Sequence, residues 1–117
     1  YMQPHYPYLT SNEGILRLYR VSYALAMTYK LSPTLAFITL LKFIYGDSYK
    51  VEETIRRLYR RNLQVVMHYV ADLIPHLDGK VLITSDHGEL LGEYGMYEHS
   101  VSAPLLYLRL VPLFVVK

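Results

Sequence analysis

The first regular pattern along the chain is helical. Between residues 12 and 29 apolar side chains recur every three or four positions, with Ser22 as a small polar gap in that stripe. Asn12 is suited to cap the first turn, and Glu13 falls inside that turn, where a carboxylate is favourable. The pattern predicts a helix over residues 12–29 that buries one face.

A second helix is expected after a short break. Ser32 can cap it, Pro33 suits its first position and a glycine closes the segment, so residues 33–45 are predicted to be helical. The longest apolar stretch, residues 31–45, is too short and too often interrupted to span a bilayer. We interpret it as a buried helix, and residues 12–47 as a helical insertion that packs over a site or against another subunit.

The third and longest helical pattern begins near Ser48 and stops before Pro75 and the Asp78-Gly79 pair. Two glutamates fall in its first turn. Its stripe of buried positions is predicted to run through Val51, Ile55, Leu58, Asn62, Val66, Tyr69 or Val70, and Leu73.

Two strands are predicted in the last third of the chain. Lys80 precedes an apolar and β-branched run over residues 81–84, and residues 110–116 form a second such run. A helix followed by a strand is half of a β-α-β unit, and this order predicts a mostly parallel sheet with helices on its faces. The expected fold class is therefore α/β, with the chain as part of an α/β/α sandwich and as one partial domain over residues 1–117.

Composition excludes some partners and chemistries. The chain has 12 basic and 10 acidic residues, and its two basic pairs, Arg56-Arg57 and Arg60-Arg61, are expected on the solvated face of the third helix. This charge balance therefore demands neither a nucleic-acid partner nor a membrane partner, and no nucleic-acid partner is expected. Without cysteine there is no disulfide framework, no thiolate metal site and no formylglycine derived from cysteine within this segment. Apolar residues at 52%, with 13 tyrosines, indicate a buried core.

The segment from Val81 to His99 carries the candidate chemistry. Its strand opens into Ser-Asp-His-Gly, so Asp86 and His87 offer a carboxylate oxygen and an imidazole nitrogen to a divalent cation. Adjacent side chains can both point inward only where the backbone departs from regular strand alternation, and Gly88 permits this departure. Calcium, magnesium, manganese and zinc all suit such a pair. For an Asp-His pair considered without its neighbours, the alternative to a metal site is that Asp86 caps a turn or helix and His87 is an ordinary loop histidine.

This segment resembles the C-terminal metal-binding motif of the alkaline phosphatase superfamily, most closely that of the sulfatases and the related phosphonate or phosphodiester hydrolases. These proteins carry a T-S-D-H-G-E-x-L-G-x-x-G pattern. The sequence matches it at Thr84, Ser85, Asp86, His87, Gly88, Glu89, Leu91, Gly92 and Gly95. The resemblance implies that Asp86 and His87 are metal ligands, and it does not make Glu89 or Glu93 a ligand.

The resemblance also implies two catalytic histidines. Where His99 stands, the related hydrolases commonly have a lysine that contacts the anionic group being transferred. His99 could therefore balance charge or donate a proton when protonated, or bind the metal when neutral. Pro4-His5-Tyr6-Pro7 resembles the P-H-x-P segment of sulfatases, whose histidine points at the transferred group. His68 and His76 fall in no matched motif and are expected to be structural.

Intact members of this superfamily are several times longer, so the chain is expected to be a C-terminal fragment of a sulfatase-like domain. The family's nucleophile and its N-terminal acidic ligands would then lie upstream of Tyr1. The expected function is metal-dependent hydrolysis of a sulfate ester or a phosphate mono- or diester. Two alternatives are a non-catalytic remnant or interaction module that self-associates, and a phosphoryl or sulfuryl transferase. The sequence assigns no compartment and leaves the oligomeric state open.

Overall fold

The computed structural model describes residues 13–99 and 105–117. The chain divides into two compact units, Tyr1–Gln64 and Val65–Lys117, and the third helix contributes to both. Among the helices that the structure describes, none combines the length and the apolar character needed to cross a membrane.

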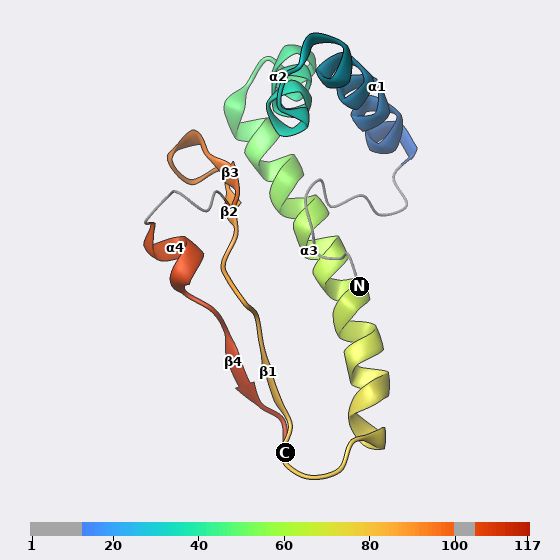
Figure 1. Cartoon of the computed structure of the whole chain (residues 1–117), viewed down its shortest axis with the longest axis vertical. Helices are drawn as coiled ribbons and strands as arrows, with labels where there is room; N and C mark the ends of the chain where they lie inside the picture. The colour runs from blue at the N-terminus through green and yellow to red at the C-terminus, as the bar shows by residue number, and fades with distance from the viewer. Residues whose placement is uncertain (1–12, 100–104) are drawn as a thin grey trace. The chain divides into compact units, whose positions relative to one another are not determined.

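The first unit contains a helical hairpin formed by α1 (Glu13–Tyr29) and α2 (Pro33–Tyr45) (Figure 1). Helix α1 ends where Lys30 takes a left-handed conformation, with φ of 54°, and the amide of Leu31 donates to the carbonyl of Ala26 at 2.9 Å. This backbone bond satisfies a carbonyl that the helix end leaves unpaired. The prediction of two helices with a short break between them is confirmed.

The ends of α2 follow from its flanking residues. The hydroxyl of Ser32 accepts a hydrogen bond from the amide of Leu35 at 3.4 Å, and a proline occupies the first turn. At the other end Gly46 has φ of 64° and donates its amide to the carbonyl of Lys42 at 2.8 Å. A residue with a Cβ would be strained there, so the glycine is what lets the helix close this way.

All three helices supply buried side chains to the first unit. Phe37 meets Tyr19 edge to face, with ring centroids 5.5 Å apart at 83°. The polar gap in the first stripe is also buried, since Ser22 is 1% exposed and its hydroxyl donates to the carbonyl of Tyr19 at 2.7 Å. Among the described residues of this unit, the buried apolar ones are Ile15, Ala26, Phe37, Ile38, Leu41, Val51, Ile55 and Leu58.

Helix α3 runs over Ser48–Leu73, close to its predicted bounds, and continues into a single 3-10 turn, η1 (Ile74–His76). Its first turn is capped by the carboxylate of Asp47, which accepts from the amide of Tyr49 at 2.8 Å. The predicted stripe is buried as far as Asn62 and is half-buried or exposed beyond it. The four arginines of the helix are exposed, as expected.

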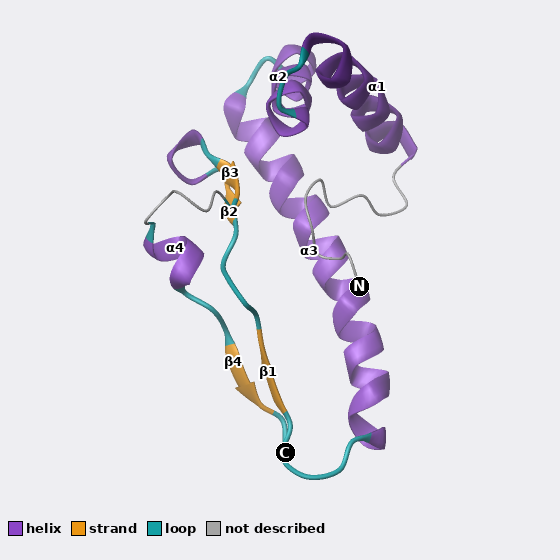
Figure 2. Cartoon of the chain, in the orientation of Figure 1, coloured by secondary structure: helices purple, strands orange, loops and turns teal. Residues whose placement is uncertain are grey.

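The second unit contains a two-stranded ribbon (Figure 2). Strand β1 (Leu82–Thr84) pairs with β4 (Leu113–Val115), with Ile83 opposite Phe114. Backbone hydrogen bonds extend the pairing beyond the strands, from the amide of Val81 to the carbonyl of Lys117 at 2.8 Å and from the amide of Val116 to the carbonyl of Val81 at 2.9 Å. Both predicted strands are therefore present, in shorter form.

The predicted fold class, an α/β/α sandwich with a mostly parallel sheet, is wrong for the described residues. Each of the two sheets holds two antiparallel strands. The order of helix and strand does not determine which strand pairs with β1 or in which direction. In the structure the partner of β1 is β4. The chain enters β4 after α4 (Leu106–Arg109), a helix of four residues, and then runs antiparallel to β1.

The chain forms a small hairpin in the segment that connects β1 to β4. It consists of β2 (Leu90–Leu91), the 3-10 turn η2 (Glu93–Gly95) and β3 (Tyr97–Glu98). The carboxylate of Glu93 accepts from the amide of Leu91 at 2.6 Å, and the amide of Gly92 donates to the carbonyl of Met96 at 2.9 Å. These bonds fix the hairpin that begins and ends at the candidate site.

Candidate metal centre

Two side-chain hydrogen bonds fix the start of the loop that follows β1. The hydroxyl of Thr84 donates to the carbonyl of Pro112 at 2.8 Å, which ties the end of β1 to the residue just before β4. The hydroxyl of Ser85 donates to the carbonyl of His87 at 3.1 Å. The Thr-Ser pair of the motif therefore shapes the backbone on which the following Asp-His pair stands.

Gly88 lies against the backbone of α4. Its amide donates to the carbonyl of Leu108 at 2.9 Å, and a Cβ built on it would lie 1.9 Å from the carbonyl oxygen of Tyr107. No side chain fits at that distance. The sequence predicts a glycine here because the backbone must leave strand alternation, whereas the structure shows that this glycine is needed for close approach.

The imidazole of His87 is held by the backbone next to it. Its Nδ1 lies 2.8 Å from the carbonyl oxygen of Gly88, and since a carbonyl only accepts, Nδ1 carries the hydrogen. In the neutral ring, Nε2 then keeps its lone pair and can bind a cation. This is the usual arrangement of a histidine metal ligand, in which the second ring nitrogen donates to a carbonyl or carboxylate.

Asp86 stands at the solvent side of the same loop. Its side chain is 89% exposed, and its Oδ1 lies 3.8 Å from Nε2 of His87. The same oxygen accepts from the amide of His87 at 3.1 Å. The two predicted metal ligands are therefore adjacent, with one carboxylate oxygen and one imidazole nitrogen near enough to approach a common cation.

His99 and Glu89 are brought together by the small hairpin. Strands β2 and β3 pair Leu90 with Glu98, and the same register continued by one residue places Glu89 beside His99. Nδ1 of His99 lies 2.9 Å from Oε2 of Glu89, whose side chain is only 10% exposed. A carboxylate this sheltered from water needs a cationic or hydrogen-bonding partner, and the imidazole provides one.

The two halves of the loop meet at their histidines. The rings of His87 and His99 have centroids 4.0 Å apart and are tilted by 36°. With Glu89 they form a cluster in which each residue offers one ligand atom and all three atoms lie within 4.8 Å of one another. The cluster joins two imidazoles and one carboxylate, a donor set that catalytic zinc sites use.

The structure places the predicted site residues as follows. Asp86, His87 and His99 lie on one loop, and the last two are in ring contact. The predicted catalytic His5 lies outside the described residues. Glu89, which the sequence analysis does not make a ligand, belongs to the cluster. Its signal in the sequence is the His-Gly-Glu spacing at the entry to a strand, where alternate residues share a face.

The comparisons with known proteins add no relative. No family model matches the chain, and neither a curated protein nor a solved structure shows significant similarity to it.

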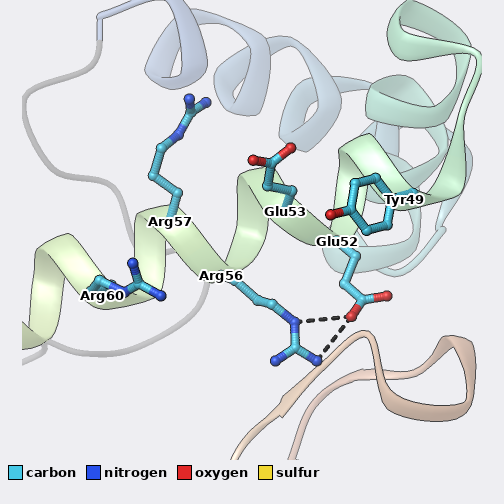
Figure 3. Close-up of a pocket in the computed structure, with 6 residues that line it drawn as sticks. All are labelled: Tyr49, Glu52, Glu53, Arg56, Arg57 and Arg60. Carbon is cyan, nitrogen blue, oxygen red and sulfur yellow. Dashed lines mark hydrogen bonds and ion pairs between the residues drawn. The ribbon is translucent and has the colours of Figure 1, made fainter.

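A polar hollow separate from the candidate metal centre lies on α3 in the first unit and has a volume of about 360 Å³. Figure 3 shows its main interaction, in which the guanidinium of Arg56 contacts one carboxylate oxygen of Glu52 through Nε and a terminal nitrogen, each at 2.9 Å. The hollow is lined by Tyr49, Glu52, Glu53, Arg56, Arg57 and Arg60. All six residues come from one helix and both signs of charge are present, so we interpret the hollow as a solvated helix face.

Proposed function

We propose that this chain supplies the C-terminal half of the active site of a metal-dependent hydrolase that acts on a sulfate ester or a phosphate mono- or diester. The observation that carries the proposal is the convergence of His87, Glu89 and His99 in the loop whose sequence resembles the sulfatase-like metal motif. The resemblance motivates the reaction class. The cluster supports the metal dependence.

The donor set indicates which cations fit. Two imidazole nitrogens favour zinc over calcium, magnesium and manganese, which prefer oxygen ligands. In the neutral ring of His87, Nδ1 donates to Gly88 and Nε2 can bind the cation. The carboxylate of Glu89 can either bind the cation itself or orient His99 as a ligand through their 2.9 Å contact. Asp86, which directly precedes His87, would add a carboxylate oxygen from the solvent side.

A cation bound here would act as a Lewis acid on an ester oxygen and favour the ionised form of a nucleophile. The residues of this chain would do the rest. Asp86 and His87 would hold the cation, as the resemblance implies. In the alternative role, in which His99 is not a ligand, it would lie beside the cation, and its Nε2 would contact an oxygen of the transferred group while Nδ1 stays on Glu89. The resemblance gives His5 the same kind of role, and a nucleophile from outside this chain completes the reaction.

The first test is calorimetric titration of the 117-residue chain with zinc, manganese, magnesium and calcium. We expect saturable binding of zinc, weakened about 10- to 100-fold or more by His87→Ala. His68→Ala is the matched control, because this histidine is 76% exposed on α3 and its described contacts are with Asp72 and the adjacent Tyr69, outside the candidate site. Absence of divalent-metal binding, or equal binding by His87→Ala, would reject the metal centre.

The second test addresses the reaction. The longest polypeptide that contains this segment is assayed with p-nitrophenyl sulfate, p-nitrophenyl phosphate and bis(p-nitrophenyl) phosphate, with and without the bound metal. We expect hydrolysis of at least one ester, and its loss in Asp86→Asn. Products formed only when an alcohol acceptor is added would replace hydrolysis by group transfer. Metal binding without any turnover would leave a metal-binding module and refute the hydrolase.

A further inference from the structure

The α1–α2 hairpin presents an apolar groove of about 410 Å³ to solvent. Several of its lining side chains are strongly exposed, namely Phe43 at 85%, Tyr29 at 67% and Leu35 at 60%. Leu25, Leu31 and Leu40 complete most of the remaining wall. Large apolar side chains gathered in one place on a surface are typical of an interaction site.

The groove does not belong to the core face of the hairpin. On α2 the buried residues Phe37, Ile38 and Leu41 form one side of the helix, whereas Leu35 and Phe43 lie on another. Helix α2 is therefore apolar on two sides and is charged only at Lys42. A helix that is apolar nearly all round requires apolar surroundings on both sides.

The charges of this segment have a single sign. Residues 14–46 contain no aspartate or glutamate, and their charged residues are Arg17, Arg20, Lys30 and Lys42, so the segment carries +4. The rest of the chain holds the other 8 of the 12 basic residues and all 10 acidic ones, and so carries −2. The exposed apolar surface and the excess of positive charge therefore occupy the same 33 residues.

Two of these basic residues directly adjoin groove residues in the sequence. Lys30 stands between Tyr29 and Leu31, both of which line it, and Lys42 directly precedes Phe43. Lysine side chains can lie along an apolar surface while their ammonium groups stay in a polar layer. Apolar residues flanked by lysines in this way are typical of helices that lie in a membrane interface.

We propose that the α1–α2 hairpin docks on the surface of an anionic lipid bilayer. Phe43, Leu35 and Tyr29 would enter the boundary between headgroups and acyl chains, and Lys30 and Lys42 would contact the lipid phosphates. A second copy of the chain fits less well, because pairing two such grooves would bring together two segments of charge +4. The inference is independent of the proposed metal centre, which lies in the second unit.

The test is sedimentation of the whole chain with vesicles. We expect binding to vesicles of equal parts phosphatidylglycerol and phosphatidylcholine to exceed binding to phosphatidylcholine alone by at least about tenfold, and to weaken as salt is raised. Replacement of Lys42 by glutamine should reduce the affinity about fivefold. Equal binding to the two kinds of vesicle would overturn the proposal.

Phe43→Asp tests the groove itself. It should reduce vesicle binding about tenfold or more, because it removes the most exposed apolar side chain of the groove. Tyr49→Asp is the matched control, since this aromatic is 72% exposed on α3 and does not line the groove. Both variants should keep the helical circular dichroism of the parent chain.

Two outcomes with Phe43→Asp would contradict docking on a bilayer. One is vesicle binding by this variant equal to that of the parent chain. The other is a parent chain that ignores vesicles and forms a dimer by light scattering, with the dimer lost in Phe43→Asp. The second result would assign the groove to a second copy.

Discussion

The imidazole rings of His87 and His99 lie 4.0 Å apart although they stand at opposite ends of the loop that contains the β2–β3 hairpin. The hairpin register brings the second histidine back to the first, and Glu89 holds it there through a 2.9 Å contact. The cluster is therefore a product of strand pairing. Changes that disturb this pairing should disturb the ligand set as much as changes to the ligands themselves.

Glu89→Gln should weaken metal binding about tenfold while it leaves stability nearly unchanged. The amide keeps the size of the side chain and can still contact His99, but it removes the negative charge that favours a cation. Calorimetric titration with zinc measures the effect. Glu53→Gln, on the exposed face of α3, is the control and should bind as the parent does. Identical affinities in the two variants would remove Glu89 from the site.

Gly88→Ala should disrupt the contact between the loop and α4. The added methyl group would lie 1.9 Å from the carbonyl oxygen of Tyr107, so the backbone must move at a cost of about 1–3 kcal/mol. We expect shifted amide resonances over residues 106–110 and weaker metal binding. Gly79→Ala is the comparison. Its φ of 80° makes an alanine strained there, but it has open space around it and lies outside the contact with α4, so it should leave those resonances in place. Unmoved resonances in Gly88→Ala would refute the close approach.

Asn62→Leu should leave the chain equally stable or more stable, by up to about 1 kcal/mol. Asn62 is fully buried, its amide nitrogen donates to the carbonyl of Leu58 at 3.0 Å, and its Oδ1 has no hydrogen-bond partner. Leucine of similar size removes both polar atoms. Asn62→Asp should instead destabilise, since it would bury a charge. Urea unfolding of both variants gives the comparison, and clear destabilisation by leucine would show that the asparagine is needed.

Phe37→Ala should cost about 3–5 kcal/mol of unfolding free energy, because the ring is fully buried against Tyr19. Phe43→Ala on the same helix should change it by no more than about 0.5 kcal/mol, since that ring is 85% exposed. Chemical denaturation followed by helical circular dichroism distinguishes the two. Equal effects would mean that the groove ring is buried in solution.

The helices could be predicted because their signals are local. Ser32, Pro33 and Gly46 lie next to the turns that they start or stop, and the structure reproduces those ends. The direction of the β1 partner could not be predicted in this way, since no residue near β1 encodes its pairing with β4. The half-exposed end of the α3 stripe was missed for the same reason, because burial there depends on what the rest of the fold supplies.

In the candidate site, too, the features with local sequence signals could be predicted, and those that depend on distant pairing could not. Asp86 and His87 could be selected because they are adjacent in a recognisable motif. The part played by Glu89 depends on the register of two strands of two residues each, which the sequence pattern is too short to specify. His99 could be proposed, but its ring contact with His87 could not.

The β1–β4 register also has a consequence for the order in which the chain folds. Pairing of Leu82 with Val115 encloses every candidate ligand of the described loop in one large ring of chain, whereas α1 and α2 meet across a short connection. Closing a large ring loses more chain entropy than closing a small one, and distant contacts form slowly. The helical hairpin is therefore expected to form early, and the cluster of histidines to assemble only once the ribbon has closed.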